Sequence, residues 1–105
     1  NLTAFVDFNG LQIDGNIEDV MNPSPIDKKF EAFGWNALVI DGHNYDEIID
    51  AIEKARNCKD MPTVIVCKTI KGKGVSFMEN DAGWHGVAPS KEQCEKALAE
   101  IGGNR

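Results

Sequence analysis

Asn9 and Leu11 lie where an apolar stretch of the sequence ends abruptly in polar and glycine residues. The amide oxygen of Asn9 and the main-chain carbonyl oxygen of Leu11 are hard donors of the kind that Mg²⁺ accepts. Mg²⁺ takes few ligands from a protein and completes its coordination with water and phosphate oxygens. The pattern therefore suits a magnesium site, and it also suits an Asn in a loop that precedes the turn at Asp14 and Gly15.

Residues 68–74 read Lys-Thr-Ile-Lys-Gly-Lys-Gly and combine lysines with glycines. Glycine lets the backbone approach a ligand closely, and lysine supplies positive charge for an anion. This composition suits a diphosphate group. The spacing differs from the Gly-x-x-x-x-Gly-Lys-Ser/Thr motif of the P-loop, and the alternative interpretation is an exposed loop with solvated lysines.

His85 follows Trp84 in a short segment that is flanked by Gly83 and Gly86. A histidine in a glycine-flanked loop is well placed to reach a substrate and to exchange a proton near neutral pH. The alternative is a surface histidine beside a tryptophan that packs on the core. For His43, which follows an Asp-Gly pair, we favour a structural role in a turn.

Three apolar segments, residues 2–8, 35–40 and 62–67, are short and end in polar or glycine residues. These features predict β-strands, and the almost continuously apolar third segment predicts a strand that is buried on both faces. Residues 45–57 carry apolar side chains on one face and charged side chains largely on the other, which predicts a helix that covers the sheet.

Strands that alternate with helices indicate an α/β fold with a parallel sheet. The loops that begin at Asn9, Asp41 and Lys68 are therefore expected at one edge of the sheet, where open α/β sheets place their ligands. We expect Asn9, Lys71 and His85 to converge at that edge.

Residues 26–33 form a shorter predicted helix, with Ser24 or Asp27 as its N-terminal cap and Gly34 at its end. The spacing of its apolar residues is helical, and its position before the second strand fits the alternating pattern.

A last helix is predicted over residues 91–101, opened by a capping box at Ser90. Ala97, Leu98 and Ile101 are expected on its inner face. Residues 102–105 are interpreted as a tail or linker.

The 105 residues suffice for one small domain, and they carry 11 basic and 17 acidic side chains without a basic stripe. With a net charge of -6, nucleic acid and membrane surfaces are not expected partners. The three cysteines, Cys58, Cys67 and Cys94, are widely spaced without a Cys-x-x-Cys pair, which argues against a disulfide framework or a zinc site. We therefore expect a reducing, cytoplasmic location. The chain starts inside a predicted strand without an initiator Met, so we expect a fragment or a processed piece.

Four separated motifs resemble those of transketolases in order and spacing. They are residues 7–15, residues 32–35 with 41–43, residues 68–74 and residues 83–86. The chain resembles the later half of the transketolase domain that binds thiamine diphosphate, and it most resembles the bacterial type whose N-terminal half is a separate subunit. This implies that residues 1–105 are a partial thiamine-diphosphate-binding domain, a parallel α/β fragment of about three strands.

The resemblance implies roles for four residues. Asn9 would bind Mg²⁺ through its side chain, and Leu11 would bind it through the main-chain carbonyl oxygen. Lys71 would lie near the cofactor, where a point charge offsets the negative diphosphate. His85 would lie between the cofactor and the bound sugar phosphate, where it would position the substrate and stabilise charge in the transition state.

For the whole enzyme, the resemblance implies transfer of a two-carbon ketol unit between sugar phosphates, with thiamine diphosphate and Mg²⁺ as cofactors. The implied partners are a C-terminal transketolase subunit or the remaining domains, in a homo-oligomer.

Two departures from the family matter. The Gly-Asp-Gly motif, which supplies the carboxylate ligand of the metal, is expected upstream of Asn1, and Val87 stands where the family often has a lysine. The 105 residues alone are therefore expected to be inactive. Two alternatives stay open, namely a non-catalytic α/β module and part of another thiamine-diphosphate enzyme such as a 2-oxo acid dehydrogenase component.

Overall fold

The computed structural model describes residues 1–102, so all but the first residue of the predicted tail lies outside the described residues. Two compact units divide the chain. The first unit comprises Asn1–Asn9 and Met21–Thr69, and the second comprises Gly10–Val20 and the chain from Ile70 onward.

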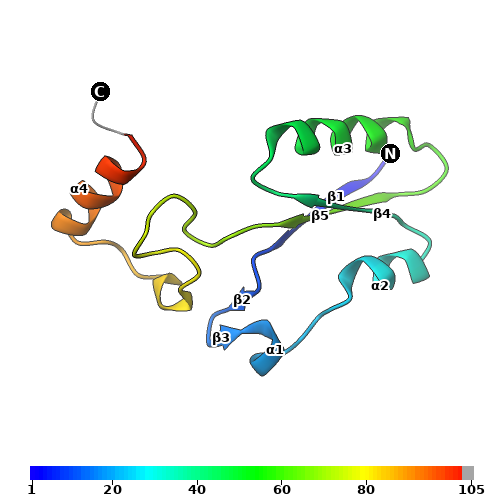
Figure 1. The fold of residues 1–105 in the computed structure, drawn as a ribbon. Helices are drawn as coiled ribbons and strands as arrows, with labels where there is room; N and C mark the ends of the chain where they lie inside the picture. The colour runs from blue at the N-terminus through cyan, green and yellow to red at the C-terminus, as the bar shows by residue number, and fades with distance from the viewer. Residues whose placement is uncertain (103–105) are drawn as a thin grey trace. The chain divides into compact units, whose positions relative to one another are not determined.

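The first unit is built on a parallel sheet of three strands in the order β1-β5-β4 (Figure 1). The strands are β1 (Thr3–Phe8), β4 (Asn36–Asp41) and β5 (Thr63–Lys68). The first four residues of β5 are buried, as expected for a central strand covered on both faces. The register pairs the last residue of β5 with the last residues of both neighbours, so all three strands end together. The predicted α/β fold with a parallel sheet is confirmed.

Helix α3 (Tyr45–Asn57) has the predicted bounds and lies on one face of this sheet (Figure 1). Asn44 caps it, because the Asn44 side chain accepts hydrogen bonds from the backbone N–H groups of the next turn. The small side chains of Ala51 and Ala55 let the helix approach the sheet, and they form the buried core with Ile65 of β5. The sheet therefore has one well-packed face under α3.

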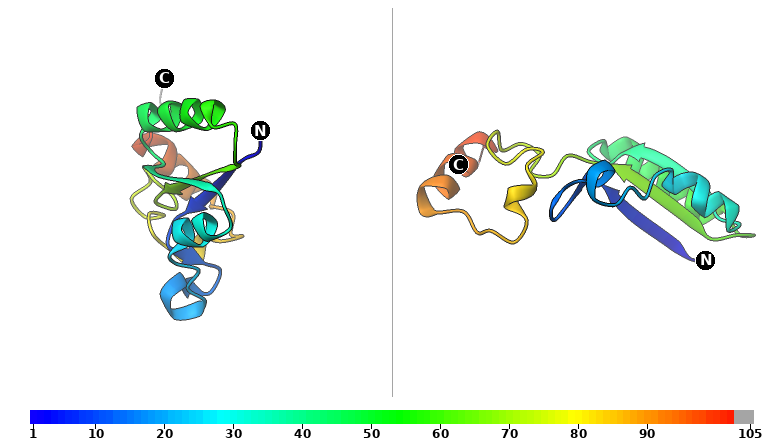
Figure 2. Two further views of the ribbon diagram at one scale, coloured as in Figure 1. Left: turned by 90° about the vertical axis from the view of Figure 1, so that its right-hand side faces the viewer. Right: turned by 90° about the horizontal axis from the view of Figure 1, so that it is seen from below.

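Helix α2 (Ile26–Ala32) lies on the opposite face, so the sheet stands between two helices (Figure 2). Its N-cap is Pro25, which forms no side-chain cap, and the expectation of a cap from Ser24 or Asp27 is wrong. Ser24 lies one position too early, and its amide instead donates to the side-chain oxygen of Asn22 at 2.9 Å.

The end of α2 follows the prediction. Gly34 has a φ of 81°, which favours glycine, and its amide donates to the carbonyl oxygen of Glu31 at 2.9 Å. The amide of Trp35 donates to the carbonyl oxygen of Phe30 at 3.1 Å. These two bonds form a Schellman motif and end the helix before β4.

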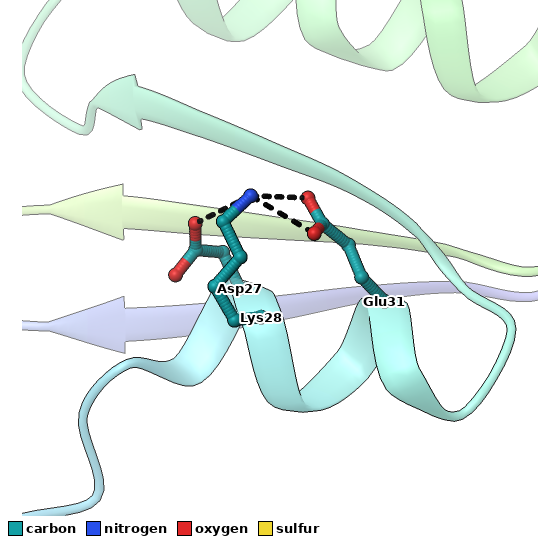
Figure 3. Close-up of polar contacts among 3 residues, drawn as sticks. All are labelled: Asp27, Lys28 and Glu31. Carbon is teal, nitrogen blue, oxygen red and sulfur yellow. Dashed lines mark hydrogen bonds and ion pairs between the residues drawn. The ribbon is translucent and has the colours of Figure 1, made fainter.

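The exposed side of α2 carries a local ion-pair group (Figure 3). Lys28 Nζ lies 2.9 Å and 3.0 Å from the two carboxylate oxygens of Glu31 and 3.8 Å from Asp27. The hydrogen bond to Glu31 raises the pKa of Lys28. Exposed pairs of this kind contribute little to stability, and Lys28 has its charge compensated within its own helix.

In the second unit, a small hairpin of β2 (Leu11–Gln12) and β3 (Gly15–Asn16) is followed by the single turn α1 (Ile17–Val20). The sequence predicted a loop from Asn9 onward. It did not predict the antiparallel pairing of β2 with β3, in which two residues of each strand take part.

The later part of the second unit contains turns over residues 70–80, the 3₁₀ turn η1 (Ala82–Trp84) and helix α4 (Lys91–Glu100). The capping box at Ser90 is confirmed. Ala97 is half-buried, whereas Leu98 and Ile101 are 44% and 57% exposed, so the predicted inward orientation of these two is wrong. Glu100 anchors α4 instead, because it accepts hydrogen bonds from the amide and the hydroxyl of Ser76. Within residues 1–102, no helix has the length and apolar character needed to cross a membrane.

Candidate functional site

Asn9 directly follows β1 and lies, half-buried, at the carboxyl edge of the parallel sheet. The loops that begin at Asn9, Asp41 and Lys68 leave the three strands at this same edge, as predicted. Open α/β sheets bind ligands outside the carboxyl ends of their strands. The first unit therefore presents Asn9 at the place where such a fold binds ligands.

The strand ends at this edge are tied together by Thr69, which sequence reasoning missed. The backbone N–H of Thr69 donates to the carbonyl oxygen of Phe8 at 3.2 Å, and its hydroxyl donates to the carboxylate of Asp7. On the other side, the amide of Gly42 donates to the carbonyl oxygen of Lys68 at 2.8 Å. The position of Thr69 in the predicted loop that begins at Lys68 was the only signal in the sequence.

Cys67 lies one residue before the end of β5, beside the same edge. Burial raises the pKa of the Cys67 thiol, and the negative charge of Asp7 raises it further. Both effects favour the neutral thiol, so Cys67 acts here as a small apolar side chain.

Leu11 lies in β2, and its backbone orientation follows from the hairpin. The amide of Ile17 donates to the carbonyl oxygen of Gly10 at 3.1 Å, and Leu11 is paired with Asn16. Hydrogen-bonded and non-hydrogen-bonded pairs alternate in an antiparallel ladder. The Leu11 and Asn16 pair is therefore of the second kind, and the Leu11 carbonyl group points away from β3.

Lys71 lies in a loop that is closed by hydrogen bonds between its own residues. The carbonyl oxygen of Lys71 accepts from the amide of Asn80 at 2.9 Å, and the amide of Gly74 donates to the carboxylate of Glu79 at 2.9 Å. Lys73 pairs with Glu79 at 3.9 Å, whereas Lys71 forms no ion pair with any carboxylate of residues 1–102. The loop is thus held in shape and carries a half-buried lysine with an uncompensated charge.

His85 is exposed and directly follows η1, and its amide donates to the carbonyl oxygen of Ala82 at 2.9 Å. Trp84 anchors this segment, because its indole N–H donates to the carbonyl oxygen of Phe77 at 2.9 Å. The two aromatic rings meet edge to face, with centroids 5.7 Å apart. The tryptophan therefore has a structural role, and the histidine beside it lies at the surface.

Asn9 belongs to the first unit, whereas Leu11, Lys71 and His85 belong to the second. The expected convergence of Asn9, Lys71 and His85 is a relation between the units, and it stays a prediction. No group of three or more His, Cys, Asp or Glu side chains within residues 1–102 has a metal-binding arrangement. The side-chain oxygen of Asn9 and the main-chain oxygen of Leu11 do not belong to these four residue types. Asn9 and Leu11 therefore stay the candidate ligands.

Transketolases and their subunits resemble this chain over nearly its full length. The 6-deoxy-6-sulfo-D-fructose transketolase subunit SqwG of Clostridium sp. (strain MSTE9) is 42% identical over 101 residues, which cover 96% of this chain and 37% of that protein. The transketolase of Homo sapiens is 35% identical over 108 residues, with 96% of this chain and 16% of the human protein covered. The chain therefore spans well under half the length of these curated relatives.

The same resemblance holds in three dimensions. The crystal structure of transketolase from Campylobacter jejuni superposes with a TM-score of 0.86 at 33% identity, covering 97% of this chain and 16% of that one. The family described as transketolase, thiamine diphosphate binding domain, matches residues 1–104. This chain therefore belongs to the thiamine diphosphate binding domain family of transketolases.

Proposed function

We propose that this chain is the later part of the cofactor-binding domain of a transketolase that transfers a two-carbon ketol unit between sugar phosphates. In this proposal the enzyme uses thiamine diphosphate and Mg²⁺. The observation that carries the proposal is the position of Asn9 at the carboxyl edge of a parallel sheet, in a chain that matches the family over nearly its full length.

The donor atoms of Asn9 and Leu11 suit a magnesium ion by their chemistry. Mg²⁺ prefers oxygen ligands, and the Asn9 side chain and the outward-pointing Leu11 carbonyl group supply two of them. Both ligands are neutral. The rest of the coordination would therefore come from diphosphate oxygens, from water and from a carboxylate elsewhere in the enzyme.

Lys71 is proposed to offset the charge of the diphosphate. Its own loop provides no carboxylate partner for it, and the hydrogen-bonded closure of that loop holds its backbone in place. A compact ammonium charge suits a phosphate group. We therefore propose Lys71 as a cofactor-binding residue.

His85 is proposed to contact both cofactor and substrate. The Trp84 anchor fixes the backbone beside it, and the imidazole lies exposed. Its role would be to orient the substrate and to stabilise negative charge that develops on a substrate oxygen. Thiamine diphosphate itself supplies the carbanion chemistry of ketol transfer.

The names of two relatives support a partner, and one of these names supports sugar phosphates as substrates. The Clostridium relative is named as a subunit, and so is an apulose-4-phosphate transketolase chain of Phocaeicola vulgatus that is 39% identical. We accordingly propose that a C-terminal transketolase subunit or further domains complete the enzyme, which assembles as a homo-oligomer and acts on sugar phosphates. We also propose a cytoplasmic location, supported by the three free thiols.

The experiment compares Asn9→Ala and His85→Ala in the complete enzyme by steady-state kinetics at varied thiamine diphosphate and Mg²⁺. Asn9→Ala should raise the concentrations of both cofactors that are required, because one ligand serves both. His85→Ala should mainly lower kcat. Asn57→Ala, at the exposed end of α3, is the matched control and should behave as wild type. An unchanged cofactor requirement in Asn9→Ala would remove Asn9 from the metal site.

The 105 residues by themselves are proposed to be inactive and to bind thiamine diphosphate with Mg²⁺ only weakly. Mg²⁺ loses its water reluctantly, and two neutral oxygens are too few to hold it. Calorimetric titration of the purified chain, alongside an assay of ketol transfer, tests this. Micromolar binding would contradict it.

A further inference from the structure

Thr69 connects the end of the central strand to the residues that directly precede Asn9. Its amide bonds to the carbonyl oxygen of Phe8, and its hydroxyl bonds to the side chain of Asp7. Asp7 and Phe8 are the last two residues of β1, and they directly precede Asn9. Thr69 therefore holds the last residues before the proposed metal ligand by two separate bonds.

Gly42 holds Thr69 from the opposite side. A Cβ atom at Gly42 would lie 2.5 Å from the Thr69 methyl carbon and 2.9 Å from the Cβ of Cys67, closer than real side chains come. The methyl group of Thr69 thus occupies space that only a glycine leaves. With the methyl group fixed against Gly42, the rotamer of Thr69 is fixed, and its hydroxyl is directed to Asp7.

We propose that Thr69 is a positioning residue of the magnesium site. It fixes the exit of β1, and thereby Asn9, by binding Asp7 and Phe8 while its methyl group packs on Gly42. Partners that orient a metal ligand without touching the metal affect metal affinity strongly. The inference rests on the proposed role of Asn9 as a ligand of Mg²⁺.

Two substitutions separate the hydroxyl of Thr69 from its methyl group. Thr69→Val keeps the shape and removes the donor to Asp7, whereas Thr69→Ser keeps the donor and removes the methyl group. Thr63→Val is the matched control, because the Thr63 hydroxyl accepts a hydrogen bond from Asn36 at 3.2 Å, at the opposite end of β5. Each valine variant therefore removes one hydroxyl-mediated link between β5 and a neighbouring strand.

The measurements, made on the complete enzyme, are Mg²⁺ binding by calorimetry at saturating thiamine diphosphate and stability by urea unfolding. Thr69→Val should weaken Mg²⁺ binding about tenfold. Thr69→Ser, which keeps the hydroxyl, should retain most of the wild-type Mg²⁺ affinity. Thr63→Val should lower stability at unchanged Mg²⁺ affinity. Equal Mg²⁺ affinity in wild type, Thr69→Val and Thr63→Val would overturn the inference.

A further variant and a reference variant keep the outcome decisive. Gly42→Ala retains the Thr69 hydroxyl but displaces the methyl group that directs it to Asp7, so it should also weaken Mg²⁺ binding. Asn9→Ala is the reference for loss of a ligand. If Asn9→Ala binds Mg²⁺ as wild type does, the proposed function of Asn9 fails and this inference fails with it. If Asn9→Ala is impaired and the Thr69 and Gly42 variants are not, only the inference about Thr69 fails.

Discussion

Gly72→Ala is expected to destabilise the loop that contains Lys71. The substitution tests whether hydrogen bonds between the loop's own residues close it. Gly72 has a φ of 71°, and a Cβ atom there would lie 2.6 Å from the backbone oxygen of Met78. Because the obstruction is backbone, it cannot rotate away. The loop has to deform to admit the substitution.

The cost has two parts. An alanine in the left-handed region costs about 1–2 kcal/mol, of which about 0.4–1 kcal/mol is offset by the lower entropy of the unfolded chain. Moving Met78 disturbs two hydrogen bonds, from its amide to Val75 at 2.9 Å and from the amide of Asp81 at 3.3 Å. At about 1 kcal/mol each, these bring the total to about 3 kcal/mol.

Gly86→Ala isolates the contribution of the contact. Gly86 has a φ of 78°, but nothing lies within 4 Å of a Cβ atom placed there. It should cost about 1 kcal/mol, the backbone part alone. Both glycines belong to the second unit. For unfolding of this unit the two variants should therefore differ by about 2 kcal/mol, which is about a thirtyfold difference in its opening equilibrium.

Native-state hydrogen exchange measures this opening directly. The amide of Asn80, which donates to Lys71, and the amide of Val75, which donates to Gly72 at 3.1 Å, report on closure of the loop. Both should exchange about thirty times faster in Gly72→Ala than in Gly86→Ala. Equal exchange in the two variants would refute the closed loop and the placement of Lys71 that depends on it.

Three further changes test other parts of the chain. Ile65→Ala empties a fully buried position in the central strand and should cost about 2–5 kcal/mol in urea unfolding. Ser90→Ala removes the capping box of α4 and should cost about 1 kcal/mol, measured from exchange of the Gln93 amide. The hydrogen bonds from the amide and then the hydroxyl of Ser76 lower the pKa of Glu100 below its ordinary value of 4.5. The ionised carboxylate is thus favoured in the folded state. Protection of the α4 amides from hydrogen exchange should therefore persist above pH 4.5 and fall as the pH drops through the lower folded-state pKa. Glu100→Gln should remove this pH dependence.

Much of the local structure is determined by short-range patterns. The almost uninterrupted apolar run of β5 predicts its burial, and the charged and apolar faces of α3 predict a helix with the observed bounds. The Gly34 end of α2 and the Ser90 start of α4 depend on groups a few residues apart, which a sequence displays directly. The predicted N-cap of α2 was wrong because Pro25 separates Ser24 from the helix.

The sequence also indicates Asn9 as a candidate ligand, since a parallel strand that ends in a polar residue presents it at the ligand-binding edge. It does not indicate Thr69, whose hydrogen bond to Asp7 spans 62 positions. Nor does it show why Gly42 is required, because the methyl group and Cβ atom that exclude a side chain there belong to another strand and its exit loop. These relations exist only once the strands are paired.

Strand order is the largest feature that the tertiary structure alone decided. β5 is the last of the three strands in the chain, yet it lies between β1 and β4. Hydrophobic pattern and propensity act within a few residues and determine which segments become strands and helices. The order and register of parallel strands depend on hydrogen bonds and packing between segments far apart in sequence, and the groups that position Asn9 come from that pairing.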